Sequence, residues 1–337
     1  MAAVWFLLVA ASVAVVGVFL ARSSDKLGEA LKLERSMTGF LMLAAATSLP
    51  ELVVSCQVAR SGAIDMAVGS LLGSCLMNLL ILAGIDLSRR SGGRILSRQA
   101  AAHAMASLAS VLLATFVAIA VLLPMTPIFG RFHWGSLLLL IGYVLTFRLV
   151  YIDRRIATAD GIGMIEDDFD DATEEPSATI RTPPRLRPAI VYGLATLGIF
   201  LLAPALASTS EQLATLLRLS GTFFGAVFLA FVTSLPEFVT TIEASRMDAD
   251  DLAIGNILGS NTFNLLILVA LDLVVDQPLF SLLGPVHAIA ALGIVVTTTI
   301  ATMGLLYRVE KRVWYMEPDA IGITLSAVAF FYLLYVL

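Results

Sequence analysis

Long apolar segments, separated by short polar ones, make up almost the whole chain. A helix needs roughly 20 apolar residues to cross the hydrocarbon core of a bilayer. Ten segments of about that length cover residues 3–21, 38–60, 65–86, 99–123, 134–152, 188–209, 221–245, 251–275, 279–304 and 318–337. The pattern therefore predicts an all-α polytopic membrane protein with ten transmembrane helices.

Composition supports this prediction. Hydrophobic residues make up 58% of the chain, charged residues only 14%, and the mean hydropathy is +0.91, whereas soluble domains carry about 25% charged residues. The first segment has no preceding basic residue and is longer than the apolar region of a signal peptide, so we interpret it as a spanning helix. The lipid bilayer is then the expected partner. No basic patch with interleaved aromatic residues suggests nucleic acid, and nothing implies a protein partner.

Basic residues orient the predicted helices, because lysine and arginine concentrate in cytoplasmic loops. With the N-terminus outside, all of the 21 lysines and arginines except Arg60, Arg131 and Arg218 fall on the inner side. We expect a protein of a prokaryotic cytoplasmic (inner) membrane with both termini extracytoplasmic. The polar stretch 153–187, with an acidic run at 166–171, is then a flexible cytoplasmic linker.

An internal repeat divides the chain at this linker. A shift of 186 residues superimposes 39–87 on 225–273 without a gap, and nearly half of the aligned residues are identical. Residues 1–152 form the first predicted five-helix repeat and residues 188–337 the second. Because five is odd, the second repeat must enter the membrane from the opposite side. The predicted repeats are therefore inverted, an arrangement common in secondary transporters, whose sites lie near the membrane midplane.

The repeated sequence Thr-Ser-Leu-Pro-Glu places Glu51 and Glu237 midway along apolar spans. A carboxylate at that depth costs several kcal/mol unless it faces protein, water or an ion. Pro50 and Pro236 lack an N–H and should disrupt the preceding turn, which frees backbone carbonyls. These carbonyls lie near Ala46 and Val232, with Ala44, Thr47, Ala230 and Thr233 beside them.

The next helix of each repeat adds further oxygen-bearing side chains. Ser74 and Asn78, and likewise Ser260 and Asn264, are four residues apart and share one helical face. Carboxylates, amides, hydroxyls and carbonyls are hard ligands that suit Ca²⁺, Mg²⁺ and Na⁺. The alternative is a pair of packing kinks with structural glutamates. The exact duplication and the absence of lysine and arginine from the cores of these four helices favour an ion site.

These motifs resemble the cation/Ca²⁺ exchanger superfamily, and within it the Na⁺/Ca²⁺ exchanger-like branch, over nearly the whole chain. The resemblance implies an antiporter rather than an enzyme, which exchanges Ca²⁺ for Na⁺ by sliding of the first helix of each repeat and needs no cofactor. It implies Glu51 and Glu237 as central Ca²⁺ ligands. It also implies ion sites completed by Thr47, Thr233, the carbonyls of Ala44 and Ala230, and the hydroxyls of Ser48, Ser74, Ser234 and Ser260.

One departure leaves the counter-ion open. Many members of the superfamily have Asp at the position of Asn264, so H⁺ replaces Na⁺ in an alternative hypothesis. A cation channel with the same ligands is a hypothesis from another class, and no Ser-His or Asp-Asp spacing beyond the repeat suggests an intramembrane protease. Outside the site, we expect Asp65 and Asp251 to cap their helices and His103 and His287 to be structural.

Overall fold

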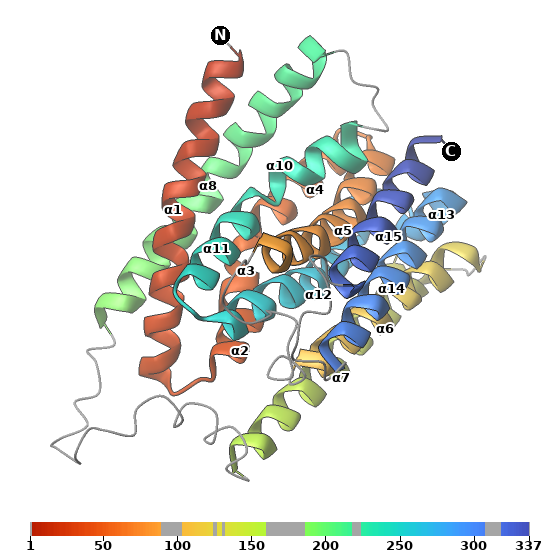
Figure 1. The fold of residues 1–337 in the computed structure, drawn as a ribbon. Helices are drawn as coiled ribbons and strands as arrows, with labels where there is room; N and C mark the ends of the chain where they lie inside the picture. The colour runs from red at the N-terminus through yellow and green to blue at the C-terminus, as the bar shows by residue number, and fades with distance from the viewer. Residues whose placement is uncertain are drawn as a thin grey trace, which may run out of the picture.

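The computed structural model describes residues 2–88, 103–123, 127–129, 132–159, 186–217, 224–306 and 318–336 (Figure 1). These residues are nearly all helical. Eight helices among them are long and apolar enough to cross a membrane, or nine when one bent helix pair counts as a single span, and Pro318–Leu334 is a shorter apolar helix. The chain is therefore a helical membrane protein, as its hydropathy predicts.

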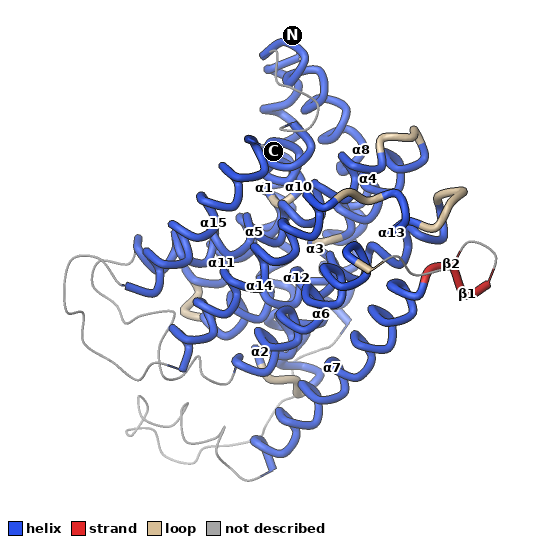
Figure 2. The backbone as a smooth tube through the Cα atoms, turned by 90° about the vertical axis from the view of Figure 1, so that its right-hand side faces the viewer, coloured by secondary structure: helices blue, strands red, loops and turns tan. Residues whose placement is uncertain are grey.

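The elements of the first half are α1 (Ala2–Leu31), α2 (Arg35–Met37), the π-helix η1 (Thr38–Leu43), α3 (Ala44–Thr47), α4 (Leu49–Arg60), α5 (Ile64–Ser88), α6 (Ala104–Leu122), β1 (Pro127–Phe129), β2 (Phe132–His133) and α7 (Trp134–Ala159). Those of the second half are α8 (Leu186–Leu217), the π-helix η3 (Phe224–Leu229), α10 (Ala230–Thr233), α11 (Leu235–Arg246), α12 (Asp250–Val274), α13 (Leu279–Leu282), α14 (Pro285–Leu306) and α15 (Pro318–Val336). The hairpin of β1 and β2 (Figure 2) was not predicted.

Several predicted boundaries differ from the helices of the structure. The expected span 279–304 begins as the short helix α13 and restarts at Pro285, because Gly284 and Pro285 interrupt a continuous helix. Helix α1 continues to Leu31, beyond the expected end at residue 21, and α7 (to Ala159) and α8 (from Leu186) both enter the stretch 153–187 that was expected to be a linker. The acidic run 166–171, and the ends of three predicted spans at 99–102, 221–223 and 337, lie outside the described residues.

The sequence repeat is also a repeat of local structure. The elements η1, α3, α4 and α5 have counterparts η3, α10, α11 and α12, each displaced by the same 186 residues. Even the turn before the last helix matches, because Gly62 (φ +89°) and its counterpart Asp248 (φ +51°) both adopt the left-handed conformation. Two copies of one sequence motif therefore fold in the same way.

The two long helices α5 and α12 form the centre of the molecule, and each packs against the π-helix of the other half. Glycine permits one of these approaches, because a Cβ on Gly39 of η1 would collide with the Leu252 carbonyl of α12. Helices α1 and α8 lie side by side at one edge of the bundle (Figure 1). Both chain termini lie toward the same end of the bundle (Figures 1 and 2).

A buried carboxylate near the end of α12 forms hydrogen bonds with three neighbouring elements. Asp272 is fully buried and accepts hydrogen bonds from the backbone N–H of His133 (2.9 Å), the hydroxyl of Ser136 (2.6 Å) and the backbone N–H of Leu279 (2.7 Å). These three hydrogen bonds connect α12 to β2, α7 and α13. These contacts give Asp272 a structural role at this end of the helix.

We expect Asp272→Ala to lower the free energy of unfolding by about 3 kcal/mol, because three buried donors lose a charged acceptor. Thermal unfolding of the purified protein in detergent measures the effect. Gln277→Ala, at an exposed position on the same segment, is the control. A melting temperature for Asp272→Ala as high as that of the control would contradict the structural role.

Candidate functional site

Each repeat interrupts a helix shortly before the glutamate of its Thr-Ser-Leu-Pro-Glu motif. In the first repeat the helix breaks at Ser48, between α3 and α4, and in the second repeat it breaks at Ser234, between α10 and α11. The segments on either side of Ser234 meet at an angle of 49°. The proline is the second residue of the new helix in both copies. The prediction that the proline disrupts the preceding turn is therefore confirmed.

Glu237 lies in the first turn of α11 and is completely buried. One carboxylate oxygen, Oε1, accepts hydrogen bonds from the hydroxyls of Ser48 (3.2 Å) and Ser260 (3.3 Å). The other oxygen, Oε2, has no hydrogen-bond partner in the described structure. Because Ser48 belongs to the first repeat, the Glu237 carboxylate lies where the two repeats meet.

Glu51 occupies the equivalent place in the first turn of α4 and is 1% exposed. Its polar neighbours, Thr233 and Ser234, come from the second repeat. Neither of its carboxylate oxygens has a hydrogen-bond partner among the described residues, and no described ion pair includes Glu51 or Glu237. Three unpartnered carboxylate oxygens at one buried interface are an arrangement that a cation would stabilise.

Amides on α5 and α12 provide further oxygens. The Asn78 amide donates through Nδ2 to Asn261 Oδ1 (3.0 Å), and its own Oδ1 has no partner. Asn264, also fully buried, has no hydrogen-bond partner at either side-chain atom in the described structure. Buried polar atoms are nearly always hydrogen-bonded, so the unpartnered atoms of Asn78 and Asn264 also indicate a place for an ion.

The predicted threonines and the serines of α5 and α12 meet across the repeats. Thr47 Oγ1 lies 3.3 Å from Ser260 Oγ, and Thr233 Oγ1 lies 3.4 Å from Ser74 Oγ. Each contact therefore joins the broken helix of one repeat to the long helix of the other.

The two predicted carbonyl ligands are not released by the helix breaks. The carbonyl of Ala44 accepts a helical hydrogen bond from the Ser48 N–H, and the carbonyl of Ala230 accepts one from the Ser234 N–H, both at 3.0 Å. Each carbonyl oxygen has a second lone pair, so a further interaction is still available to it.

All twelve residues predicted for the site are at most 2% exposed and lie on the broken helices or on α5 and α12. They are Ala44, Thr47, Ser48, Glu51, Ser74, Asn78, Ala230, Thr233, Ser234, Glu237, Ser260 and Asn264. No group of three or more His, Cys, Asp or Glu residues occurs in the described part of the chain. The arrangement instead combines two carboxylates with neutral oxygens, which suits a hard cation better than a soft metal.

Two buried asparagines on α12 were not among the predicted ligands. Asn256 accepts a hydrogen bond from Thr47 (Oγ1 to Oδ1, 3.3 Å), and Asn261 accepts one from Asn78. Their counterparts in the first repeat are Ser70 and Cys75. Because neither asparagine occurs in both copies, a search for repeated residues does not select them.

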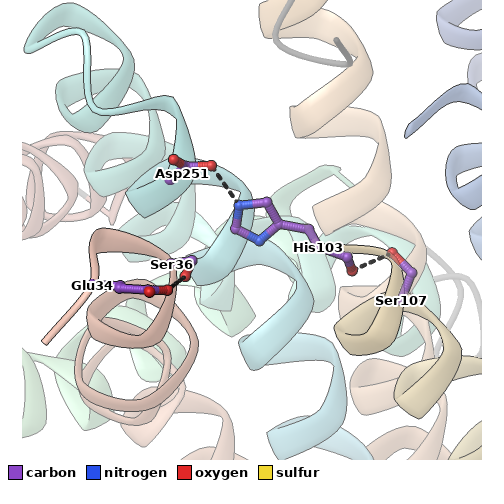
Figure 3. A network of polar contacts seen from close by, with 5 residues as sticks. All are labelled: Glu34, Ser36, His103, Ser107 and Asp251. Atoms are coloured by element: carbon purple, nitrogen blue, oxygen red, sulfur yellow. Dashed lines mark hydrogen bonds and ion pairs between the residues drawn. The ribbon is translucent and has the colours of Figure 1, made fainter. Parts of the chain in front are cut away.

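Two histidine–aspartate contacts lie outside the site and correct the capping prediction. His103 Nε2 lies 2.8 Å from Asp251 Oδ1, with the histidine ring directed toward the start of α12 (Figure 3). His287 Nε2 lies 3.7 Å from Asp65 Oδ1. The residue before α12 is Ala249, and Asp251 lies within the first turn, so Asp251 is not the N-cap. Each contact joins helices of different repeats, which fits the structural role predicted for the histidines.

A hollow of about 560 Å³ reaches one of the predicted site residues, Ser234. It lies between α5 and α11 and follows α11 from Ser234 to Arg246, about 18 Å of helix. On the equivalent face of the first repeat, Leu52 and Cys56 pack against the same hydrophobic cluster as Phe263 and Leu266.

A polytopic helical protein with a buried, oxygen-lined interface between two repeats has the architecture of a membrane transporter of inorganic cations. The chain matches the sodium/calcium exchanger protein family over residues 1–164 and 188–337. It belongs to this family, whose members are cation/Ca²⁺ antiporters, and the resemblance identified from the sequence is confirmed.

Individual relatives agree with this assignment. The chain is 28% identical to the inner membrane protein YrbG of Escherichia coli, over 69% of this chain and 67% of that protein. It is 27% identical to the putative antiporter CaxA of Alkalimonas amylolytica, over 73% and 72% of the two chains. Among solved structures, the sodium-calcium exchanger NCX_Mj matches with a TM-score of 0.67 at 17% identity and covers 97% of this chain and 96% of that one. NCX_Mj therefore shares the fold.

Proposed function

We propose that this protein is a secondary antiporter that exchanges Ca²⁺ for Na⁺ at a site between Glu51 and Glu237. The observation that supports the proposal most strongly is the burial of both carboxylates at the repeat interface, with three of their four oxygens unpartnered in the described structure. Such oxygens are costly to bury unless a cation neutralises them. The proposed ligands are the twelve residues predicted from the sequence.

The charge of the site supports Ca²⁺ as the main cargo. Glu51 and Glu237 contribute at most two negative charges, and one Ca²⁺ balances both. Several Na⁺ ions bound together would leave net positive charge in a site of low dielectric constant, which is unfavourable. Asn264 supplies an amide where an aspartate would have offset that charge. This observation favours a second candidate, in which protons on the two glutamates replace part of the Na⁺.

We further propose that the two halves are inverted five-helix repeats that alternate between two accessible states. The matched elements displaced by 186 residues support the repeats, and the contact between the counterparts Cys75 (Sγ) and Asn261 (carbonyl, 3.7 Å) lies where an axis relating them would pass. Alternation between the two states would then exchange the conformations of the two repeats.

A channel with the same ligands would conduct Ca²⁺ without a counter-ion, and this difference tests the proposed class. Proteoliposomes loaded with radioactive Ca²⁺ should retain it when the outside medium contains neither Ca²⁺ nor Na⁺ at constant pH. They should release it when an exchangeable cation is added outside. A continuous leak in the absence of any exchangeable cation would identify a channel instead.

The proposed orientation places both termini outside and the stretch 153–187 in the cytoplasm. A single cysteine introduced at position 170, in a variant whose Cys56 and Cys75 are replaced, should react with a membrane-impermeant maleimide only after the cells are opened. A cysteine placed next to the N-terminus is the matched control and should react in intact cells. Labelling of position 170 in intact cells would overturn the orientation.

Deletion of the acidic run 166–171 should leave basal transport unchanged, because the run lies far in sequence from every proposed ligand. Ca²⁺ uptake by the purified deletion variant, compared with the full chain at equal protein, measures this. Loss of uptake by a stably folded deletion variant would show that the linker does more than connect the repeats.

A further inference from the structure

Two networks of hydrogen bonds lie behind the proposed ligands, and both are centred on asparagines of α12. Asn256 is completely buried and donates through Nδ2 to the hydroxyls of Thr240 (3.0 Å) and Thr241 (3.1 Å). The Thr240 hydroxyl itself donates to the Pro236 carbonyl (2.8 Å), so its oxygen can only accept from the amide. This fixes the amide orientation and leaves Asn256 Oδ1 directed at Thr47.

The fixed amide determines how Thr47 presents its oxygen. The Thr47 hydroxyl has one proton, and both Asn256 Oδ1 and the Ala44 carbonyl, each at 3.3 Å, can only accept it. The proton is thereby directed away from Ser260, which lies on the site side. The lone pairs of Thr47 then face the position of a cation, where a proton would be repelled.

Asn261 has the same relation to Asn78. It donates through Nδ2 to the backbone carbonyl of Cys75 (3.2 Å), which can only accept, so its Oδ1 must face Asn78. Asn78 donates to that Oδ1 at 3.0 Å, and the Oδ1 of Asn78 remains unpartnered among the described residues. The amide of Asn78 is therefore held with its carbonyl oxygen available and its N–H groups turned away.

The ligands proposed in the second repeat, Thr233 and Asn264, lack equivalent supports. The counterparts of Asn256 and Asn261 are Ser70 and Cys75, and neither is an amide. Thr233 donates to backbone carbonyls of its own helix, Leu229 at 3.0 Å or Ala230 at 3.3 Å. Asn264, the counterpart of Asn78, has no side-chain hydrogen bond in the described structure. The two halves of the site are therefore not equivalent.

We infer that Asn256 and Asn261 are positioning residues that hold the first-repeat ligands Thr47 and Asn78 with their oxygen lone pairs toward the cation, while Asn264 is left unanchored to turn toward or away from it. This inference rests on the proposed ion site. It assigns a role to two residues that bind no ion themselves and act only through their partners.

A double-mutant cycle tests the inference. Asn256→Ser and Asn261→Cys place on α12 the residues that α5 carries at the equivalent positions, so the fold should accept them. Each should raise the KM for Ca²⁺ in counter-ion-driven uptake by about three- to tenfold, the equivalent of one oriented hydrogen bond, with a smaller change in kcat. In a Thr47→Val background Asn256→Ser should have no further effect, because the side chain that it orients is gone.

Thr240→Val provides a second route to the same test. The counterpart of Thr240 is Val54. The Thr240 hydroxyl anchors Asn256 and otherwise contacts only the backbone carbonyls of Pro236 (2.8 Å) and Glu237 (3.2 Å), not the Glu237 carboxylate. The Thr240→Val substitution should raise the KM for Ca²⁺ in the wild-type background and should leave it unchanged in the Thr47→Val background. Independent, multiplicative effects of Thr47→Val and either Asn256→Ser or Thr240→Val would overturn the positioning role. If Thr47→Val alone leaves KM unchanged, the ion site itself is wrong.

Discussion

Glu51→Gln or Glu237→Gln should abolish Ca²⁺ transport while the protein remains folded. Each glutamate supplies half of the negative charge of the proposed site, and both are buried. Removal of one charge from a buried pair of opposite charges, here a carboxylate and Ca²⁺, costs on the order of 3–5 kcal/mol. This cost corresponds to a roughly hundredfold or greater loss of Ca²⁺ affinity. Gln is close to Glu in size, so the packing of α4 and α11 should survive.

Glu243→Gln is the matched control for this experiment. Glu243 is also buried on α11, but its carboxylate pairs with Arg22 (2.7 Å) at the side of α1 and not with the site. Purified variants should be compared by Ca²⁺ uptake and by the rise in melting temperature that Ca²⁺ causes. Both responses should persist in Glu243→Gln and disappear in the two site variants. Wild-type uptake by either site variant would contradict the two-glutamate site.

The sequence predicted the helix breaks because proline lacks an N–H and stands before the glutamate in both copies of the motif, although Pro204 lies inside the continuous helix α8. The burial of the glutamates followed for a similar reason, since apolar residues surround them in the chain. The π-helical turns η1 and η3, by contrast, carry no sequence signature that residue spacing reveals. They depend on how each broken helix packs against the long helix of the other repeat.

The hydrogen bonds of Asn256 and Asn261 were also beyond sequence reasoning, for a different physical reason. The repeat drew attention to residues present in both copies, and these two occur in only one. The pairing of His103 with Asp251 was missed because a carboxylate in the first turn of a helix is an adequate capping residue in isolation. Only the folded structure brings α6 against the start of α12.

Asn264→Asp should shift the exchanger toward Na⁺ dependence. A third carboxylate would offset the excess positive charge of several bound Na⁺ ions, which two glutamates cannot do. We expect the apparent affinity for Na⁺, measured as Na⁺-driven Ca²⁺ efflux at constant pH, to rise by about tenfold, with a steeper dependence on Na⁺ concentration. The unpartnered amide of Asn264 gives the new carboxylate room to approach the ion.

Asn78→Asp is the matched comparison, because it adds the same charge at the equivalent position of the first repeat. Asn78 is held by Asn261, so the new carboxylate there would lose a donor interaction and should give a smaller gain. If Na⁺-driven flux is already steep in the wild type and unchanged in Asn264→Asp, geometry rather than charge sets the coupling.

The most direct test of the central claim is Ca²⁺ flux through the purified protein in proteoliposomes, with the Na⁺ gradient and the pH gradient varied separately. Vesicles loaded with Na⁺ should accumulate radioactive Ca²⁺ when they are diluted into Na⁺-free medium at equal pH, and Glu51→Gln and Glu237→Gln vesicles should not. Accumulation that follows the pH gradient alone would assign H⁺ as the counter-ion. Accumulation that needs no cation gradient, or that persists in both glutamate variants, would contradict an antiporter built on these two carboxylates.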